Sequence, residues 1–571
     1  METRNVLIIG GMVLGPKAAC RVKRLKPHWQ VTLVDQQADI AYSACGIPYF
    51  LAGDVPELQE LMTTSFHMVR SPAFFENAKD VRLKTRTRAL SINRQAKKVR
   101  VRHLDHGHEE ELPYDYLVLA TGSQPVPLSI PGSHLPEVIN ISTLQQAQEI
   151  KNRLSRGEVA RAVIIGGGPE GCQLAAAISD LWGVETTLME THDQLFPGLL
   201  DLPLARMVLQ HLQERGVEVL LQQTLKEIYQ NSGDHPLEVV TADTRRLTDL
   251  VITALGRQPQ TDLAAQAGLL VRPGLGIVVN DRLQTSDPDI YAAGGCAALT
   301  HLITGKPVYF PEVSLAHRQG RIIGTNLAGG YAIFPGVVGS FACKVFDLAV
   351  AGTGLTLTAA RQEGLDPLAA LVVQQDHAHF FPQQELIYLQ LVVDRQTQRL
   401  LGAQGVSHNG DALVGRINSI AALLQQRASL ADLANLEMAY SPPLGTALDI
   451  VNTAANTAEN IIAGYNQSID PEEFSRLFLK ESPDNLVVLD VRGAANATPF
   501  VNRFGERWLN IPQETLRHRF SEVPKDKKII LVCNAGMRSY EALRQLQTQG
   551  FDNAVGLQGG VASLKKAGLL R

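Results

Sequence analysis

The sequence of 571 residues predicts an α/β protein with two doubly wound nucleotide-binding units, a further α/β domain and a separate α/β module at its C-terminal end. Two observations predict the first part: the order strand, glycine-rich turn, helix, strand, acidic residue occurs near residue 10 and again near residue 166. A third predicts the last module, because a late apolar strand ends in a cysteine-containing turn that opens a helix. At this length, three or four domains are expected.

The composition restricts the class of protein. Hydrophobic residues make up 45% of the chain and charged residues 19%, and the net charge of -4 gives no general attraction to nucleic acid or membranes. Six scattered cysteines without a CxxC pair predict neither a disulfide framework nor a zinc site. The segment before the first strand is too short for a signal peptide, and no apolar stretch is long enough to span a bilayer. We therefore expect a cytoplasmic protein with no metal, no nucleic-acid partner and no membrane insertion.

The first nucleotide-binding unit is predicted from the order of its parts. Glycines let a pyrophosphate approach the helix N-terminus, and an acid 20 residues after the last glycine accepts from a ribose hydroxyl. Met12 stands where the middle glycine is expected, so the match is imperfect. The parts are the strand Val6–Ile9, the glycines Gly10, Gly11 and Gly15, a helix from about Pro16 to Lys26, the strand Val31–Val34 and Asp35.

The second unit has the complete glycine pattern, with its acid 19 residues after the last glycine. A carboxylate at the ribose repels a 2'-phosphate, so Glu190 favours NADH over NADPH. Glu170 puts a negative charge inside the turn, and the sequence gives no physical account of it. The parts are the strand Ala162–Ile165, the glycines Gly166, Gly168 and Gly171, a helix from about Cys172 to Leu181, the strand Thr186–Met189 and Glu190.

Three further segments carry a family resemblance. Tyr116–Ser123 and Val251–Pro259 resemble the crossovers between the nucleotide domains of flavin disulfide reductases, and Thr285–Gly294 resembles their second FAD motif. The chain is similar to the branch of single-cysteine coenzyme A disulfide reductases and NADH-dependent persulfide reductases that carry a rhodanese domain. The resemblance implies two Rossmann-like domains of the glutathione reductase type, FAD and NADH as cofactors, and a homodimer. It adds the cofactor-binding positions Ala120, Thr121, Gly122, Gly256 and Gly294.

The resemblance also orders the domains along the chain. An FAD-binding domain is expected at residues 1–123 and 258–328, around an NADH-binding domain at 124–257. An α/β dimerisation domain at 329–463 and a rhodanese-like α/β domain at 469–571 follow.

Cys45, within Ala41–Tyr49, matches the family's redox cysteine by position. The resemblance implies that electrons pass from NADH through FAD to this thiol, which forms a mixed disulfide or persulfide with the substrate. An isolated cysteine more often only packs, so the surrounding motif decides. A helix N-terminus and the oxidised flavin would favour its reactive thiolate. The cysteines expected to be structural are Cys20, Cys172, Cys296 and Cys343.

The C-terminal module carries the second reactive cysteine. Cys533 follows the strand Lys528–Val532 and opens a loop that ends at Arg538, ahead of a helix. Successive N–H groups at a helix start hold a thiolate or persulfide. With Asp490–Arg492 and Gly559–Val561, this loop resembles a rhodanese active-site loop. We therefore expect Cys533 and Arg538 to act in sulfur transfer.

Several positions depart from the family pattern. Gly295 replaces an aspartate that binds the ribityl chain, and losing such a hydrogen bond would cost about 1–3 kcal/mol. The two tyrosines that assist the thiol are replaced by Phe380 or Phe381 and by Leu444. Without them, a substrate whose thiolate leaves easily is favoured, so we expect a persulfide or polysulfide in preference to coenzyme A disulfide. The other departures are Leu14, Ala44 and Gln173.

Two candidate features are open to two interpretations. His379 takes the place of a family glycine and is either a substitute acid or a solvated loop residue. Arg21, Lys23 and Arg24 lie where related enzymes bind the phosphates of coenzyme A, a candidate substrate or bound thiol, but they also fit a solvated helix face.

Three function classes follow. The leading hypothesis is an FAD-dependent NADH oxidoreductase that reduces sulfane sulfur or coenzyme A disulfide at Cys45, coupled to a sulfurtransferase module. A second is an NADH oxidase or peroxidase acting through a Cys45 sulfenate, although Val13 stands where those relatives have a histidine. The third is a sulfur carrier whose flavin site has degenerated.

Overall fold

The computed structural model describes residues 2–233 and 235–570 and confirms the predicted α/β class. The chain divides into two compact units. The first contains the residues up to Met189 together with Gln223–Val337, and the second contains Glu190–Gln222 and the residues from Val338 onward. Segment 190–222, predicted in the NADH-binding domain, thus groups with the second unit.

Parallel strands form the central sheet of the first unit, in the order β20, β7, β1, β2, β3. Val6 pairs with Val31 on one side and with Tyr116 on the other. The turns that follow these strands therefore lie together at the carboxyl edge of the sheet, where nucleotides bind in such folds. The strands are β1 (Asn5–Ile9), β2 (Gln30–Val34), β3 (Arg82–Lys84), β7 (Tyr116–Leu119) and β20 (Ile290–Ala292).

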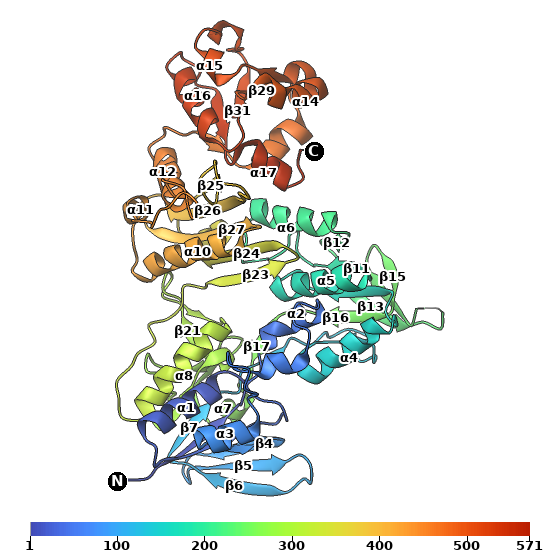
Figure 1. Cartoon of the computed structure of the whole chain (residues 1–571), viewed down its shortest axis with the longest axis vertical. Helices are drawn as coiled ribbons and strands as arrows, with labels where there is room; N and C mark the ends of the chain where they lie inside the picture. Colours follow the sequence, from blue (N-terminus) through green and yellow to red (C-terminus); the bar gives the residue numbers. More distant parts are fainter. Residues whose placement is uncertain (1, 234, 571) are drawn as a thin grey trace. The chain divides into compact units, whose positions relative to one another are not determined.

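Alternating side chains of β1 face two different cores. Val6 and Ile8 pack with helices α1 (Leu14–Leu25) and α8 (Val313–Leu327), which lie against each other (Figure 1). Leu7 and Ile9 face the core that includes an antiparallel three-stranded sheet. The strands of that sheet are β4 (Thr87–Asn93), β5 (Lys98–His103) and β6 (Glu109–Pro113).

The second nucleotide-binding unit repeats this arrangement. Strand β10 pairs in parallel with β11 and β16, and β16 pairs with β9. The two predicted crossover segments pair with each other as the antiparallel strands β8 (Ser123–Pro125) and β17 (Arg257–Pro259). The other elements are β9 (Val138–Ile139), α4 (Leu144–Ser155), β10 (Arg161–Ile165), α5 (Pro169–Trp182), β11 (Glu185–Met189), β16 (Leu250–Thr253) and the antiparallel β13 (Leu225–Gln230), β14 (Leu237–Thr241) and β15 (Arg245–Thr248).

An antiparallel sheet, in the order β23, β24, β27, β26, β25, forms one layer of the second unit. On β27, Gln404 points toward helix α6, and a Cβ at Gly405 would point at Leu413 of α10. The two helices therefore cover opposite faces. The elements are α6 (Leu202–Glu214), β23 (Phe341–Val345), β24 (Leu348–Gly354), α9 (Leu357–Gln362), β25 (Pro367–Gln375), β26 (Leu386–Asp394), β27 (Leu400–Ser407), α10 (Gly410–Gln425), α11 (Leu430–Ala434) and α12 (Ile450–Ile462).

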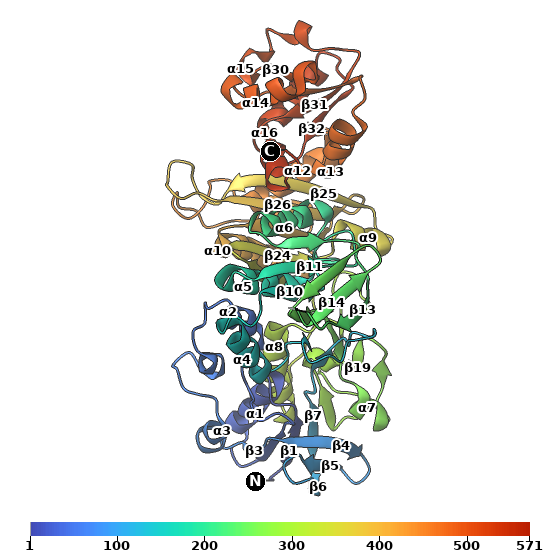
Figure 2. The same cartoon turned by 90° about the vertical axis from the view of Figure 1, so that its right-hand side faces the viewer.

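The C-terminal module, drawn in orange to red in Figure 2, has a parallel sheet in the order β28, β32, β31, β29, β30. Leu489 and Leu531 face one buried core, and Val488 and Ile530 face the other. Both strands therefore read as continuous apolar runs, as expected for a sheet covered on both faces. The elements are β28 (Ser468–Ile469), β29 (Leu486–Asp490), α14 (Ala494–Phe504), β30 (Trp508–Asn510), α15 (Gln513–Leu516), β31 (Lys528–Val532), α16 (Met537–Gln547), β32 (Ala554–Leu557) and α17 (Gly560–Lys566).

None of the helices in the described part of the chain combines the length and apolar character needed to cross a bilayer. The helix boundaries differ slightly from prediction: α1 begins at Leu14, and α5 begins at Pro169. Glu170 therefore belongs to the first turn of a helix, which accounts for an acid at this point better than a loop position does.

Candidate active sites

Close backbone contacts explain the glycines of the first turn. Gly10 has φ +114°, and a Cβ there would lie 2.0 Å from the Ala120 carbonyl oxygen. A Cβ at Gly15 would lie 1.9 Å from the Gly10 carbonyl oxygen. Asp35, directly after β2, accepts a 2.5 Å hydrogen bond from the Gly11 N–H, and its burial raises the pKa of its carboxyl group. The turn and the acid thus meet at the sheet edge, as dinucleotide binding requires.

The residues after β7 border the same edge. Ala120 N–H donates to the Ile9 carbonyl at 2.8 Å, and the Thr121 hydroxyl donates to the Gln260 carbonyl at 2.9 Å. Gly122 has φ +67°, and no atom lies within 4 Å of where its Cβ would be. The chain therefore leaves open space beside Gly122, and this edge fits part of a dinucleotide such as FAD.

Directly after the predicted second FAD motif, Gly295 stands in place of the family's aspartate, and the backbone there is closely packed. Gly294 N–H donates to the Gln319 side chain at 2.8 Å. A Cβ at Gly295 would lie 3.2 Å from Ser123 Oγ, which accepts a 3.0 Å hydrogen bond from Arg257 Nε. Ser123 and Arg257 thus border the place of the missing aspartate.

The second turn repeats the contacts of the first. Gly166 has φ +114°, and a Cβ there would lie 2.3 Å from the Ala254 carbonyl oxygen. A Cβ at Gly171 would lie 1.8 Å from the Gly166 carbonyl oxygen, whereas the space beside Gly168 is open. Gly256, after β16, has φ +82°. These residues fit a second dinucleotide.

Glu190 follows β11 and is buried. Its Oε1 accepts from the His192 N–H at 2.9 Å and from the Thr191 hydroxyl at 3.0 Å, and it contacts His192 Nδ1 at 2.6 Å. The carboxylate is therefore held in one orientation by the two residues that follow it.

Cys45 lies in a short 3-10 helix, Ala44–Gly46, directly before α2 (Ile47–Leu51). Helix α2 packs on α5, where Gln173 donates a 3.0 Å hydrogen bond to the Tyr49 hydroxyl. The Trp182 indole N–H also donates to the Leu51 carbonyl at 2.7 Å. The cysteine motif is thereby attached to the helix that begins at the second glycine turn.

Charges from three distant segments act on Cys45. Cys45 is solvent-exposed as a residue, yet partial burial of its sulfur is the largest cause that raises its pKa. Glu312 and Glu170 raise this pKa further, and Arg257 opposes them. Burial also raises the pKa of both glutamates. Burial and the two carboxylates thus outweigh the one cation and raise the pKa of Cys45, and the expected effect of a bound oxidised flavin on its thiolate stays a prediction.

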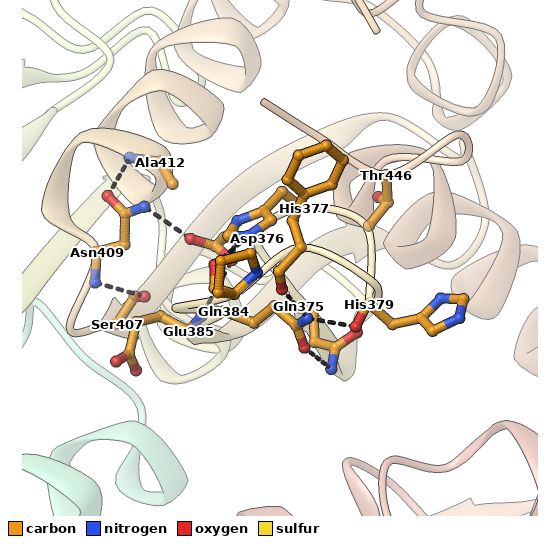
Figure 3. Close-up of polar contacts among 12 residues, drawn as sticks. Gln375, Asp376, His377, His379, Gln384, Glu385, Ser407, Asn409, Ala412 and Thr446 are labelled. Atoms are coloured by element: carbon orange, nitrogen blue, oxygen red, sulfur yellow. Dashed lines mark hydrogen bonds and ion pairs between the residues drawn. The ribbon is translucent and has the colours of Figure 1, made fainter. Parts of the chain in front are cut away.

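The loop that contains His379 begins at a buried carboxylate (Figure 3). Asp376 accepts from Asn409 Nδ2 at 2.7 Å and from the Glu385 N–H at 3.0 Å, and it pairs with His377 Nδ1 at 2.8 Å. His379 is exposed, and its ring extends away from this cluster. Its interpretation as an acid stays a prediction.

The two positions of the missing tyrosines lie on adjoining loops. Ala378 N–H donates to the Pro442 carbonyl at 3.1 Å, which joins the loop of Phe380 to the loop of Leu444. Phe380 is 65% exposed and Leu444 is 78% exposed. Both apolar side chains are therefore exposed on loops of the dimerisation domain.

Cys533 lies at the carboxyl end of β31 and before α16. Its sulfur accepts a hydrogen bond from the Gly536 N–H at 3.1 Å and lies 3.5 Å from the Ser539 hydroxyl. Gly536 has φ +110°, a conformation that favours glycine. The loop therefore curls back on the sulfur, as a sulfur-transfer loop must. Arg538 lies half-buried in the first turn of α16.

A buried ion pair supports the neighbouring strand end. Asp490 and Arg492 are joined by a 2.6 Å contact, and the Trp508 indole N–H donates to Asp490 at 3.0 Å. Val491 N–H donates to the Val532 carbonyl, directly before Cys533. Arg492 binds Asp490 through its Nε and Nη2 atoms, so this buried pair is suited to holding the strands that flank the loop.

Basic side chains gather on α1 and α8. Arg21 Nε donates to Thr325 at 3.1 Å, and the pKa of Arg21 is lowered by burial and by the charges of Arg321 and Arg24. Burial and the nearby Lys17 lower the pKa of His317. Lys23 instead pairs with Asp80 and with local carbonyls. Arg21 and Arg24, noted in the sequence, thus lie near cations of α8 that the sequence did not indicate, and whether they bind coenzyme A phosphates stays a prediction.

Glu312 and Arg257 were not predicted from the sequence as neighbours of Cys45. Arg257 lies in the crossover segment Val251–Pro259 and Glu312 lies in no recognised motif, and in neither case does the local sequence indicate an effect on Cys45. Cys172 and Cys296 are fully buried, with sulfur contacts to the carbonyls of Gly167 and Ala293.

Comparisons with known proteins match three consecutive regions of the chain. Residues 4–320 match the family described as pyridine nucleotide-disulphide oxidoreductase, 340–450 its dimerisation domain, and 470–567 the rhodanese-like domain. The NAD(P)H coenzyme A polysulfide/persulfide reductase of Pyrococcus horikoshii is 31% identical over 78% of this chain and 96% of that protein. A NAD-dependent persulfide reductase from A. fulgidus is 36% identical, with a TM-score of 0.91 over 98% of this chain and 99% of that one. The reduced CoADR-RHD of Bacillus anthracis is 27% identical, with a TM-score of 0.89 over 99% and 98%.

Proposed function

Because the chain belongs to the pyridine nucleotide-disulphide oxidoreductase family and carries dimerisation and rhodanese-like domains, we propose that it uses NADH and FAD to reduce sulfane sulfur at Cys45. The observation that carries this proposal is the attachment of the Cys45 motif to α5, the helix that opens at the second glycine turn. Relatives named as persulfide or polysulfide reductases support the substrate class. The family's dimerisation domain supports a homodimer.

The cofactors would be held by two sets of residues. FAD would be held by Gly10, Gly11, Gly15, Asp35, the segment Ala120–Gly122 and Gly294; NADH would be held by Gly166, Gly168, Gly171, Glu190 and Gly256. When bound, FAD supplies two-electron redox chemistry between a nicotinamide and a sulfur atom. The domain limits given above stay predictions.

Cys45 would act as a nucleophile toward a persulfide, RSSH. Its thiolate attacks the outer sulfur, the S–S bond of the substrate breaks, and RS⁻ leaves, so that Cys45 becomes a persulfide. Two electrons that originate in NADH then break the Cys45 S–S bond, release HS⁻ and restore the thiolate. A leaving thiolate of low pKa needs little protonation, which suits a protein in which Phe380 or Phe381 and Leu444 replace the two assisting tyrosines of the family.

Cys533 would take up or present sulfane sulfur. With thiosulfate as donor, its thiolate attacks the outer sulfur and releases sulfite, which leaves a Cys533 persulfide for transfer to an acceptor. Arg538, at the start of α16, would contribute positive charge toward an anionic donor. The hydrogen bond from Gly536 N–H stabilises the sulfur anion in either state.

Coenzyme A, as a substrate or bound thiol, is a finer proposal. The charges of Arg24 and Arg321 both lower the pKa of Arg21, so the three cations lie close together. No carboxylate is among the causes of that shift. Such a group would attract the phosphates of a nucleotide thiol.

Spectra and two cysteine variants test the proposal. We expect the purified protein to show flavin absorption that NADH bleaches anaerobically and that a persulfide or polysulfide restores. Cys45→Ser should abolish NADH-dependent sulfide release and keep sulfur transfer from thiosulfate to cyanide. Cys533→Ser should do the reverse, and Cys20→Ser serves as the matched control that keeps both.

Three results would contradict parts of the proposal. A colourless protein that still transfers thiosulfate sulfur would identify a sulfur carrier with a degenerate flavin site. NADH-dependent oxygen consumption without a sulfur substrate would identify an oxidase. Faster reduction of coenzyme A disulfide than of persulfide would overturn the substrate preference.

A further inference from the structure

One side chain of the rhodanese-like domain covers the edge of the antiparallel sheet. Strand β25 is an edge strand, and Leu371 turns its N–H away from the neighbouring strand β26. Gln558 accepts a 2.8 Å hydrogen bond from that N–H. Its Nε2 donates to the Ser468 hydroxyl at 3.1 Å. An edge N–H that would otherwise need water or another chain is thereby satisfied within the protein.

The next two residues are pressed between this strand and the Cys533 loop. Gly559 and Gly560 have φ values of +68° and +59°. A Cβ at Gly559 would lie 3.1 Å from the Val373 side chain on β25, and a Cβ at Gly560 would lie 2.5 Å from the Cys533 carbonyl oxygen. No side chain could be inserted at Gly560 without moving one of the two backbones.

The following residues bind the Cys533 loop directly. Val561 N–H donates to the Cys533 carbonyl at 2.8 Å, and Ala562 N–H donates to the Asn534 carbonyl at 2.9 Å. Contacts therefore run without a gap from β25 through Gln558 and the glycine pair to the residue that carries the sulfur.

We propose that Gln558 is a positioning residue for Cys533. Through Gln558, strand β25 of the dimerisation sheet supports the loop that carries Cys533. This rests on the proposed sulfurtransferase role of Cys533. Without the side-chain oxygen of Gln558, the glycine pair can move away from β25, and the carbonyl groups of Cys533 and Asn534 lose their fixed partners. Small displacements of a reacting group reduce rates strongly, by as much as about 100-fold per ångström.

Three variants of the full chain test this assignment. Gln558→Leu removes the acceptor for Leu371 N–H, and Gln558→Glu keeps an acceptor oxygen while losing the donor to Ser468. Gln549→Leu, at an exposed position of the same domain, is the matched control. Sulfur transfer from thiosulfate to cyanide gives kcat and KM, and iodoacetamide labelling with peptide mapping gives the reactivity of each cysteine.

We expect Gln558→Leu to lower kcat by about tenfold with little change in the KM for thiosulfate. Because Cys533 is only 2% exposed, we also expect its labelling to accelerate, while Cys296 in the first unit stays unlabelled. Gln558→Glu should resemble the unaltered protein in both measurements.

A wild-type kcat and a wild-type labelling rate of Cys533 in Gln558→Leu would overturn the proposal. Equal acceleration of labelling at Cys296 would also overturn it, because the change would then be general unfolding. If the unaltered protein transfers no sulfur, the sulfurtransferase role fails, and the labelling rates alone still decide whether Gln558 holds the loop.

Discussion

Two glutamates give Cys45 an acidic neighbourhood. Glu312 lies directly before α8 and Glu170 lies in the first turn of α5. Carboxyl groups at the starts of two helices thus act on the Cys45 thiol. Burial favours the neutral form of both glutamates and of Cys45. With the protein surroundings alone, Cys45 is therefore protonated to a greater extent than a free cysteine at the same pH.

The pH dependence of Cys45 labelling follows from these charges. A raised pKa means that the thiolate forms, and iodoacetamide reacts, only at higher pH than with a free cysteine. Glu312→Gln removes the charge that raises this pKa most, so the labelling curve of flavin-free protein should move to lower pH. The measurement is the rate at Cys45 by peptide mapping between pH 7 and about 10, a range that brackets the ordinary cysteine pKa.

Glu60→Gln, at an exposed position of the same unit, is the control and should leave the curve in place. A curve for Glu312→Gln that coincides with that of the unaltered protein would show that Glu312 does not act on Cys45.

At the scale of elements, helix α6 is joined to the dimerisation sheet by one buried carboxylate. Asp201, directly before α6, accepts from Gln390 Nε2 at 2.7 Å, from Gln404 Nε2 at 2.8 Å and from the Leu357 N–H at 2.9 Å. Strands β26 and β27 and helix α9 thus share one acceptor. This explains why segment 190–222 groups with the second unit rather than with the rest of the predicted NADH-binding domain.

Asp201→Ala should destabilise the second unit. The change leaves two buried donors and one partly buried donor without an acceptor, and each buried donor costs about 1–3 kcal/mol, so we expect a loss of about 3 kcal/mol or more. Urea unfolding followed by intrinsic fluorescence measures the loss. Asp193→Ala, at an exposed position before the same helix, should lie within about 0.5 kcal/mol of the unaltered protein. Equal stabilities for both variants would contradict the role of Asp201.

At the scale of the molecule, the rhodanese-like domain is bound to α6 and to the dimerisation sheet by polar contacts. Arg206 of α6 binds Glu472 through two contacts of 2.6 and 2.8 Å. Lys566 of α17 lies 2.9 Å from His408 Nε2, after β27. Together with Gln558, these contacts make the domain part of one compact unit.

Reversal of the Arg206–Glu472 pair tests this docking. Arg206→Glu places two carboxylates together and should speed chymotryptic cleavage after Tyr465, which lies 51% exposed before the domain. Adding Glu472→Arg should restore slow cleavage, with a coupling energy of about 1–2 kcal/mol for a bidentate, partly buried pair. Lys480→Glu, on the exposed surface of the same domain, should cleave at the original rate. Cleavage of the double variant as fast as that of Arg206→Glu would contradict the docking role.

Local chemistry made much of this protein predictable. Strand–glycine–helix segments have backbone requirements that few residues meet, so the turns at Gly10 and Gly166, the acid Asp35 and the loop of Cys533 lie where the motifs indicate. The expected crossover segments also pair, because both must pass between the same two sheets.

Contacts between distant segments could not be read from the sequence. Glu312, Glu170 and Arg257 act on Cys45 only because distant segments come together: burial and the two glutamates raise its pKa, and Arg257 opposes them. Gln558 meets Leu371 across 187 positions of the chain. The sequence by itself determined which residues are candidates for the chemistry, since motifs are local; tertiary structure decided the charges and supports around them, since electrostatics and packing depend on distance in space.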